Sequence, residues 1–535
     1  MMGIPEINNK IITPKKHKEI MEENKIRNGK WKLSADVVII GSGAGGSVAA
    51  AELSKNGWKV VLIEEGSYFT PAQFNGDEFL SNTRLYRDAG FILAEEQTLN
   101  IVQGRTLGGS TTINWQTSLY PPIYVTDEWD KRFGLKDYSK EKMNPYIEEI
   151  HARLGVHQVP EALINRNNNV LRKGGEKLGL HPEVLPNNNR GCHGLGRCGM
   201  GCPINAKQSM FLTFLPDALE YGAQIITNMR AIKIEDGKMK TVLAEFTPDP
   251  YEKYSDELIK EMEIQAPVVI VSAGAVEGPA LLQRSSLGNN WVGRNFKVHP
   301  TTTIFALFEE EIKMFSGPPQ SIVIKDGHNQ DNTGYGFWLE TAPFRPALAT
   351  SLVPFYGKQQ FDVMKDYLHL QAGIVLVRDG ADGETNARVE WKSGKRKVYF
   401  EITPTDGRNL LRGLKMLAEV QVAAGAKQLI FPFTRMKKPY IVEKNSNFDW
   451  ILKESATADS INIGSAHPHG SIQAADSPER GAIAPNFELY GHKNIFVMDA
   501  SVFPTGLSVN PQITTMSLSL RASRALAAEK VVRVN

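Results

Sequence analysis

The stretch Asp36-Val-Val-Ile-Ile-Gly-Ser-Gly-Ala-Gly-Gly46 decides the fold. Its first five residues predict a short strand buried on both faces, and the glycines that follow predict a tight turn. Residues 47–56 are rich in Ala and predict a helix, and residues 58–63 predict a second buried strand. Strand, turn, helix and strand together form a βαβ unit, which predicts a parallel sheet.

The glycines of this turn have the spacing of a dinucleotide-binding site. In Gly41-x-Gly43-x-x-Gly46, the first glycine permits the turn, the second lets the backbone approach a pyrophosphate, and the third lets the helix pack on the sheet. Glu64 lies 23 positions after Gly41, at the end of the second strand, where an acid can bond ribose hydroxyls. A purely structural glycine turn is the alternative, and the strand–turn–helix context favours dinucleotide binding.

The rest of the chain divides by its pattern of apolar residues. Buried strands at residues 268–272 and 494–498, with helices at 277–284 and 511–530, continue the parallel sheet. Between residues 301 and 455 the pattern alternates, which is typical of antiparallel strands. We therefore expect an α/β fold, in which a Rossmann-type domain is joined to a domain with an antiparallel sheet flanked by helices. The expected boundaries are 33–300 and 456–535 for the first domain and 301–455 for the second.

Three strands, a hairpin and a helix are expected in the second domain. The strands span residues 302–307, 321–324 and 334–339, and the helix spans 408–424. Residues 388–392 and 395–402 predict a hairpin with its turn at Ser393-Gly394.

Composition excludes several function classes. The 535 residues carry a formal net charge of +2 with no long basic run, so we expect no nucleic-acid partner. No stretch of about 18 apolar residues is present, so we expect no transmembrane segment. Residues 1–32 are polar and lack the apolar core of a secretory signal. We therefore expect a cytoplasmic protein, with export by association with a partner left open.

Further motifs stand along the chain in a fixed order. The glycine-dense segment Gly104-Arg-Thr-Leu-Gly-Gly-Ser-Thr-Thr-Ile-Asn114 comes first, followed by Ser272-Ala-Gly-Ala275 and Val292-Gly-Arg-Asn-Phe-Lys-Val-His-Pro300. His467-Pro-His-Gly-Ser471, Asp499-Ala-Ser501 and Asn510-Pro511 complete the series. With the first glycine turn, they resemble the glucose–methanol–choline (GMC) oxidoreductase family, from residue 36 to about residue 527. The resemblance is greatest to bacterial members that are like long-chain or hydrophobic alcohol oxidases.

This resemblance implies that the cofactor is FAD. The ADP half would be held by Gly41, Gly43, Ala44, Gly45, Gly46 and Glu64. The isoalloxazine side would be lined by Arg105, Gly108, Gly109, Ser110 and Asn114, and the pyrophosphate and ring edge would meet Asp499, Ala500 and Pro511. Some members attach FAD through a histidine just before the loop asparagine. Ile113 stands there in this chain, so we expect non-covalent FAD.

The resemblance also places a catalytic pair near the C-terminus. Oxidation of an alcohol needs a base for the hydroxyl proton and a donor that stabilises the developing alkoxide. By position in the motifs, His467 would be the base and Asn510 the alkoxide partner. A histidine suits the first task because its unperturbed pKa is near neutrality. His469 is the competing base, and we interpret His299 as structural.

Three cysteines, Cys192, Cys198 and Cys202, lie within eleven residues. An odd, clustered set is a poor disulfide framework. The segment resembles a cysteine segment of bacterial GMC members, and also the three-cysteine segment that holds a 3Fe–4S cluster in FAD-dependent sugar dehydrogenases. Its spacing differs from the latter. An iron–sulfur cluster and a structural loop of free thiols both remain open, and zinc is less favoured because too few ligands are present.

The predicted function is FAD-dependent oxidation of an alcohol to an aldehyde or ketone, with hydride transfer to flavin N5. A hydrophobic or long-chain alcohol is expected as substrate. A flavin-dependent lyase or decarboxylase remains an alternative, because fold does not determine function. An iron–sulfur sugar or polyol dehydrogenase, with a small partner subunit, is another. Oxygen, a quinone or a cytochrome would reoxidise the flavin.

Overall fold

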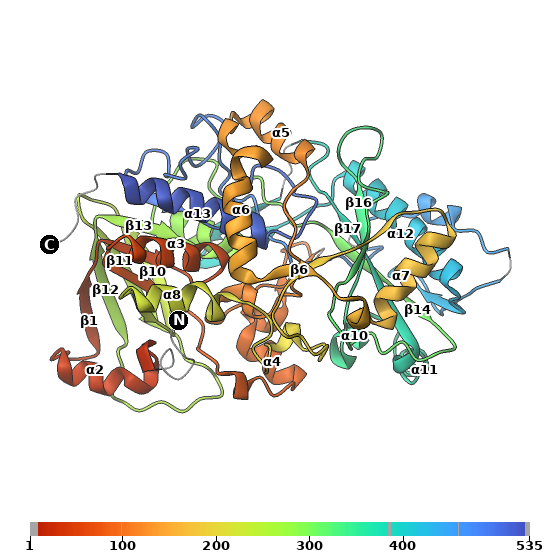
Figure 1. Cartoon of the computed structure of the whole chain (residues 1–535), viewed down its shortest axis with the longest axis horizontal. Coiled ribbons are helices and arrows are strands. Elements are labelled where there is room, and N and C mark those ends of the chain that lie inside the picture. The colour runs from red at the N-terminus through yellow and green to blue at the C-terminus, as the bar shows by residue number, and fades with distance from the viewer. Residues whose placement is uncertain (1–8, 98, 384–386, 444, 458, 530–535) are drawn as a thin grey trace.

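The computed structural model describes residues 9–97, 99–383, 387–443, 445–457 and 459–529 (Figure 1). One half of the molecule contains a five-stranded sheet in the order β23-β13-β2-β3-β9, with every neighbouring pair parallel. The strands are β2 (Val37–Ile40), β3 (Val60–Ile63), β9 (Gln224–Ile226), β13 (Val268–Val271) and β23 (Ile495–Val497). Every residue of β2, β3 and β13 is buried. The predicted Rossmann-type core is confirmed.

Helices cover this sheet and end the described chain. Helix α3 (Ala44–Lys55) packs on α13 (Gln512–Ala528), although almost 460 residues separate them, and the two lie side by side in Figure 1. Helix α9 (Gly274–Arg284) follows β13. Both α3 and α9 begin three residues earlier than predicted. Gly45 and Gly46 lie in the first turn of α3, and Gly274 begins α9. From sequence alone, such glycines indicate a loop.

A smaller sheet stands beside the parallel one. Its order is β1-β12-β11-β10, with β1 (Lys30–Ser34) parallel to β12 (Glu261–Ala266). Strands β11 (Lys240–Phe246) and β10 (Met229–Glu235) complete it in antiparallel fashion. Alternate residues of β11 are buried, as expected for a sheet with one covered face.

The second half of the molecule is built on a ten-stranded sheet, on the right of Figure 1. Its central run is β22-β14-β17-β16-β15, and helices α12 (Pro404–Ala424) and α7 (Arg166–Lys177) pack together on one face. Added Cβ atoms on Gly413 of α12 and Gly373 of β17 would meet Phe337 and Leu417 respectively, so this face is tightly packed. The sheet contains β4 (Ile92–Leu93), β5 (Asn100–Ile101), β7 (Pro182–Val184), β14 (Thr301–Leu307), β15 (Ile322–Ile324), β16 (Phe337–Thr341), β17 (Leu370–Val377), β20 (Gln428–Ile430), β21 (Tyr440–Ile441) and β22 (Gly464–Ser465).

Several bounds in this half differ from the sequence prediction, and the helix expected at residues 408–424 begins at Pro404. The strand expected at residues 334–339 begins at Phe337 and runs to Thr341. The hairpin β18 (Arg388–Lys392) and β19 (Lys395–Tyr399) forms with the predicted turn, with positive φ at Ser393 and Gly394, and its second strand ends three residues before the predicted end at residue 402. It is a separate two-stranded sheet that packs against α9 and not part of the large sheet. Several strands of the large sheet come from outside residues 301–455, and the domain boundaries stay a prediction.

The remaining α-helices and a further two-stranded sheet, β6-β8, complete the described part of the chain. They are α2 (His17–Glu23), α4 (Glu78–Leu85), α5 (Ile123–Phe133), α6 (Lys140–Leu154), α8 (Phe214–Glu220), α10 (Pro346–Leu352), α11 (Lys358–Met364), β6 (Val156–Gln158) and β8 (Pro186–Asn188). Within the described ranges, no helix combines the length and the apolar character needed to cross a membrane.

Candidate active site

A cavity of about 670 Å³ runs from the glycine turn to the large sheet. This volume is within the range that holds a cofactor or a drug-sized ligand. One end is lined by the turn after β2, the end of β3 and the start of α9. The other end is lined by β14, β16, β17 and α10, and residues 465–468 and 510–512 lie between them.

The glycines of the turn have distinct roles. A Cβ on Gly41, whose φ is +103°, would collide with the carbonyl group of Ser272, and one on Gly45 would collide with that of Met498. A Cβ on Gly46 would collide with the carbonyl of Gly41. At Gly43 a Cβ would meet nothing within 4 Å, and this residue lines the cavity. The backbone therefore leaves space at Gly43 and the start of α3, where a helix N-terminus favours a phosphate group.

Glu64 joins the turn to the end of β3. Its Oε2 accepts hydrogen bonds from the amide (3.0 Å) and hydroxyl (2.6 Å) of Ser42, and its Oε1 accepts one from the amide of Gly66 (2.8 Å). Glu64 also lines the cavity, the position required for the predicted bond to ribose hydroxyls. The hydroxyl of Ser42 in turn accepts a hydrogen bond from the amide of Gly108 at 2.9 Å. Sequence reasoning missed this bridging serine.

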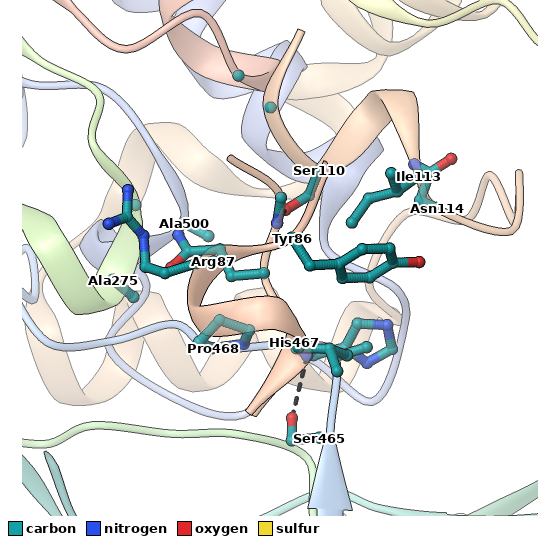
Figure 2. A pocket seen from close by; sticks show the side chains of 18 of the residues that line it. Tyr86, Arg87, Ser110, Ile113, Asn114, Ala275, Ser465, His467, Pro468 and Ala500 are labelled. Carbon is teal, nitrogen blue, oxygen red and sulfur yellow. Dashed lines mark hydrogen bonds between the residues drawn. The ribbon is translucent and has the colours of Figure 1, made fainter. Parts of the chain in front are cut away.

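The segment at residues 104–114 forms the next wall, with Ser110, Ile113 and Asn114 labelled in Figure 2. The Asn114 amide donates to Oε1 of Gln512 at 2.7 Å, which ties the segment to the start of α13. Behind it, the buried ammonium of Lys207 donates to the carbonyl oxygens of Thr112 (2.7 Å) and Asn114 (3.0 Å). Burial lowers the pKa of Lys207 to about 8.

The predicted cofactor residues near the C-terminus also reach the cavity. Asp499, Ala500 and Pro511 line it, and Ala500 is labelled in Figure 2. The Asp499 carboxylate accepts hydrogen bonds from the amides of Gly274 (2.7 Å) and Ser501 (2.8 Å). It therefore joins the start of α9 to the end of β23.

Most of the predicted cofactor residues line one cavity. These are Gly41, Gly43, Ala44, Gly45, Glu64, Gly109, Ser110, Asn114, Asp499, Ala500 and Pro511. Gly46, Arg105 and Gly108 are not among the lining residues: Gly46 packs α3 on the turn, and Gly108 donates to Ser42. Arg87, which the sequence analysis missed, lines the cavity and forms an ion pair with Glu65 at 2.7 Å.

His467 and Asn510 meet on the cavity wall, as Figure 2 shows for the histidine. The Nε2 atom of His467 lies 3.4 Å from the Asn510 amide nitrogen, and the His467 amide donates to the hydroxyl of Ser465 at 3.0 Å. Oδ1 of Asn510 is buried without a partner among the described residues. The fold thus brings together the pair predicted from the motifs, and Oδ1 of Asn510 can still accept a hydrogen bond.

The competing base, His469, is oriented differently. Its ring is fully buried, is not among the cavity-lining residues, and its Nδ1 lies 2.7 Å from the carbonyl oxygen of His467. The geometry therefore favours His467 over His469 as the group that meets a ligand.

The expected near-neutral pKa of His467 does not fit its surroundings. Burial, with a smaller contribution from His469, lowers the pKa of His467 to about 3. Its imidazole is therefore neutral above about pH 5. The sequence pattern could not indicate this shift, because burial comes from residues far apart in the chain.

His299 contacts the same ring. Its Nδ1 lies 3.3 Å from Nδ1 of His467, while its Nε2 accepts a hydrogen bond from the amide of Leu507 at 2.9 Å. Burial holds the pKa of His299 well below its usual value. The neutral His299 ring therefore carries its proton on Nδ1 and presents it to His467.

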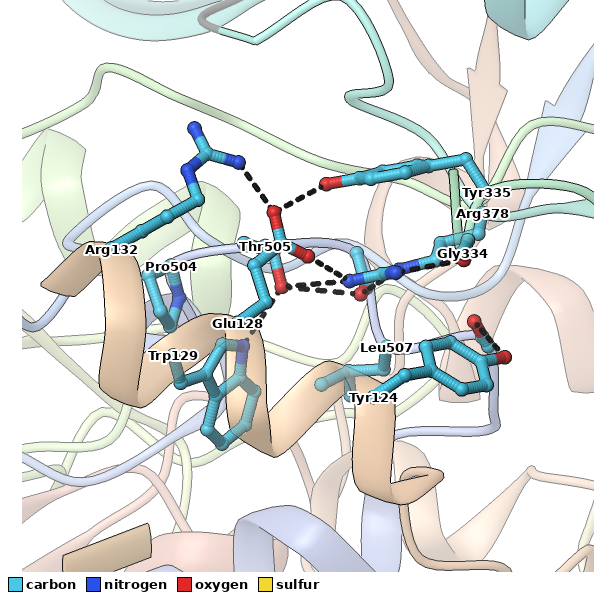
Figure 3. Close-up of polar contacts among 12 residues, drawn as sticks. Tyr124, Glu128, Trp129, Arg132, Gly334, Tyr335, Arg378, Pro504, Thr505 and Leu507 are labelled. Atoms are coloured by element: carbon cyan, nitrogen blue, oxygen red, sulfur yellow. Dashed lines mark hydrogen bonds and ion pairs between the residues drawn. The ribbon is translucent and has the colours of Figure 1, made fainter. Parts of the chain in front are cut away.

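A polar cluster fixes the loop that precedes Asn510 (Figure 3). Arg378, at the end of β17, donates from Nε to the carbonyl oxygen of Gly506 (2.8 Å) and forms an ion pair with Glu128 of α5 (2.5 Å). Trp129 donates to the hydroxyl of Thr505 at 2.8 Å. The large sheet and α5 thus together hold residues 505–507, which contact His299 and lead to Asn510.

Cys198 lies beside the segment at residues 104–114, because the Lys207 ammonium that bonds Thr112 and Asn114 also donates to the carbonyl oxygen of Cys198 at 2.8 Å. Cys198 is buried, and the amide of Gln116 donates to its sulfur at 2.9 Å. Burial raises the pKa of Cys198 to about 11 and also raises that of Cys192. In the described part of the chain, the group of ligand atoms within 4.8 Å of one another is His299, Asp379 and His469, without a cysteine. The iron–sulfur cluster and the thiol loop both stay predictions.

Fold and site together define an oxidoreductase of the dinucleotide-binding class. A family model described as GMC oxidoreductase matches residues 37–301, and a second with this description matches residues 382–519. The chain is 30% identical over 525 residues to long-chain-alcohol oxidase FAO1 of Arabidopsis thaliana, covering 93% of this chain and 67% of the relative. It is 31% identical to FAO4B of the same plant, covering 91% and 66%. The chain thus spans about two thirds of the length of these relatives.

A solved structure shows the same fold. The formate oxidase of Aspergillus oryzae RIB40 matches with a TM-score of 0.69 and 15% identity, over 93% of this chain and 99% of that one. The chain belongs to the GMC oxidoreductase family and is an FAD-dependent oxidoreductase that acts on CH–OH groups. The expected likeness to long-chain alcohol oxidases is confirmed, although these two relatives are plant and not bacterial proteins.

Proposed function

We propose that this chain oxidises a hydrophobic or long-chain alcohol to its aldehyde or ketone, with His467 as base and Asn510 as alkoxide partner. The observation that carries the proposal is the 3.4 Å pair of His467 and Asn510 on the wall of a cavity that continues to the glycine turn. Bound there without a covalent link, FAD would accept the hydride from the carbinol carbon. The space at Gly43 and the cavity-facing Glu64 fit its ADP half.

The end of the cavity that is lined by the large sheet and α10 suits an apolar substrate. Its walls carry Leu93, Leu99, Val102, Trp115, Phe344, Leu348, Leu352, Ile374, Leu376, Pro432, Ile461 and Ile463. Burial of each methylene group against such a wall is worth about 0.8 kcal/mol, so affinity should rise with chain length. Polar residues of the same wall, among them Thr303, Gln320 and Asn462, leave places for polar groups of a substrate.

The two side chains have complementary tasks. A hydroxyl placed between them can donate to Nε2 of His467 while it accepts a hydrogen bond from the Asn510 amide. The neutral imidazole takes the proton. The hydrogen bond from the Asn510 amide strengthens as negative charge develops on the substrate oxygen. Removal of water from the enclosed site strengthens both interactions.

The resting ring protons set a condition on this step. A neutral His467 carries one ring proton, so it can accept either the Nδ1 proton of His299 at Nδ1 or a hydrogen bond from the Asn510 amide at Nε2, but not both. Proton acceptance at Nε2 requires that ring proton to lie on Nδ1, which breaks the contact with His299. This contact is long, at 3.3 Å, and hydrogen bonds of catalytic groups often rearrange only when substrate binds.

The experiment that tests the function is anaerobic mixing of the FAD-loaded protein with alcohols of increasing chain length, followed by absorbance. Bleaching of the flavin bands, with apparent affinity rising with chain length, is expected. Failure of every alcohol to bleach the flavin would refute the proposal. Acid precipitation of the same protein should release the flavin into the supernatant, because Ile113 offers no atom for a covalent link. Flavin that stays in the pellet would refute non-covalent binding.

A further inference from the structure

One acidic side chain lies at the apolar end of the cavity. Glu340 belongs to β16, where Phe337 packs toward α12. Because successive residues of a strand point to opposite faces, Glu340 is on the other face, where it lines the cavity. Among the described residues that line this end from β14, β16, β17 and α10, it is the one acid.

The Glu340 carboxyl is only half satisfied. The Gln320 amide donates to its Oε2 at 2.5 Å, and Gln320 is itself held by the hydroxyl of Thr117 at 2.6 Å. No described residue donates to Oε1, and Glu340 is only 1% exposed, so bulk solvent does not reach this oxygen either. A buried oxygen without a partner costs about 1–3 kcal/mol, so the site is built for a donor that the chain does not supply.

Nearby charge does not supply that donor. The positive charge of Lys325 tends to lower the pKa of Glu340. Its ammonium, however, pairs with Glu183 at 2.7 Å and lies over the ring of Trp338. Burial therefore dominates and raises the pKa of Glu340 to about 7. At neutral pH the carboxyl is available in both its ionised and its neutral form.

The sheet register places Glu340 away from the catalytic pair. Thr303 of β14, Ile374 of β17 and Glu340 form one row, and Thr301 pairs with Gly464 of β22, three residues before His467. Three strand spacings and two residues along a strand put the Cα atoms of Glu340 and Gly464 roughly 16 Å apart. The lining residues that β14 and β17 contribute between them are Thr301, Thr302, Thr303, Ile374 and Leu376.

We propose that Glu340 binds a second hydrogen-bond donor, a hydroxyl or an amino group, at the far end of the alcohol substrate. The substrate class is then an alcohol with an apolar chain and a terminal donor. This inference rests on the proposed function for the position of the reacting carbinol. The contact would satisfy Oε1 and would select substrates by length, because both ends must be reached at once.

The test compares decanol, decanediol and aminodecanol in the FAD-loaded wild-type protein and in E340L and E340Q. We expect kcat/KM for one or both bifunctional alcohols to exceed that of decanol by about ten- to a hundred-fold, the scale of a hydrogen bond to a charged group. E340L should remove this preference, so that the three alcohols react with similar kcat/KM within that variant. The control T303V changes a cavity residue of the same row and should keep the preference.

The two bifunctional alcohols distinguish the donor. A preference for aminodecanol that grows as pH rises through about 7, and that E340Q removes, identifies an ammonium. A preference for decanediol that E340Q partly keeps identifies a hydroxyl. Equal kcat/KM for the three alcohols, or a preference that E340L leaves unchanged, would overturn the inference.

Binding of decylamine separates this inference from the proposed function. This amine has no carbinol, and its affinity can be measured from the perturbation of the flavin spectrum. Tighter binding to wild type than to E340L supports the Glu340 site even if no alcohol reduces the flavin. Equal binding of decylamine to both proteins, together with an unchanged preference among alcohols, refutes the site while leaving alcohol oxidation intact.

Discussion

Replacement of Glu128 by Ala should destabilise the loop that carries Asn510. Arg378 is 2% exposed in its side chain and Glu128 is 15% exposed. Removing one partner of a buried pair costs about 3–5 kcal/mol, because the other charge is left uncompensated. Arg378 keeps its bonds to the carbonyl oxygens of Gly506 and Gly334, so we expect the lower end, about 3 kcal/mol.

The same variant should slow the reaction. Arg378 and Trp129 hold residues 505–507, and Leu507 in turn holds His299. A misplacement of about 1 Å at the reacting groups can cost a hundred-fold in rate, so we expect a ten- to hundred-fold fall in flavin reduction. FAD content should stay near normal, since the glycine turn is not touched.

The assay is urea unfolding, followed by tryptophan fluorescence, together with stopped-flow flavin reduction. The matched control is E311A, which removes an ion pair with Lys313 whose side chains are 43% and 50% exposed. Such a pair contributes at most about 1 kcal/mol, so E311A should change neither readout much. If E128A lowers stability by no more than E311A and leaves the reduction rate intact, the role assigned to this cluster is wrong.

Three further predictions concern the cofactor end and the cysteines. E64A should weaken FAD binding by about ten- to a hundred-fold, because it removes a charge-assisted hydrogen-bond acceptor. The flavin that the protein retains after dilution measures this effect. Unchanged retention would show that Glu64 does not bind the cofactor. Glu277 is buried, yet Arg87 and Arg396 lower its pKa to about 2, so it stabilises the fold above about pH 4.5 and this contribution is lost as pH falls toward 2. Urea unfolding of wild type and E277Q at several pH values should therefore converge at low pH, and a constant difference would contradict the assignment. Iodoacetamide should label Cys198 slowest of the three thiols at neutral pH, because burial raises its pKa to about 11; iron analysis of the same sample, at about three irons per chain for a cluster and none for thiols, decides between the two interpretations.

Local features of the sequence predicted the parallel sheet well. The glycine turn and the apolar strands at β2, β3 and β13 form over a few neighbouring residues, and their pattern is sufficient to identify them. The sequence pattern predicts the start of helix α3 three residues too late because Gly45 and Gly46 belong to its first turn. Glycines are poor helix formers in general, and here close packing on Met498 and Gly41 requires them.

The remaining features depend on contacts between distant residues. Glu128 and Arg378 are 250 positions apart, and no local pattern indicates their pairing. Glu340 follows an alternating strand pattern that would normally place an acid in solvent. It is buried because the cavity-forming segments cover that face. The low pKa of His467 has the same cause, since the residue is buried among segments far apart in the chain, with His299 in contact with its ring.

The most direct test of the central claim is the limiting rate of anaerobic flavin reduction by saturating decanol across the pH range, in wild type, H467A and H469A. Because the pKa of His467 is about 3, we expect a wild-type rate that is independent of pH above about 5. H467A should lose about 10²–10⁴-fold at every pH, the usual scale for general acid–base catalysis, with FAD content near normal. H469A should keep most of the rate. If H469A abolishes reduction and H467A does not, the base has been assigned to the wrong histidine.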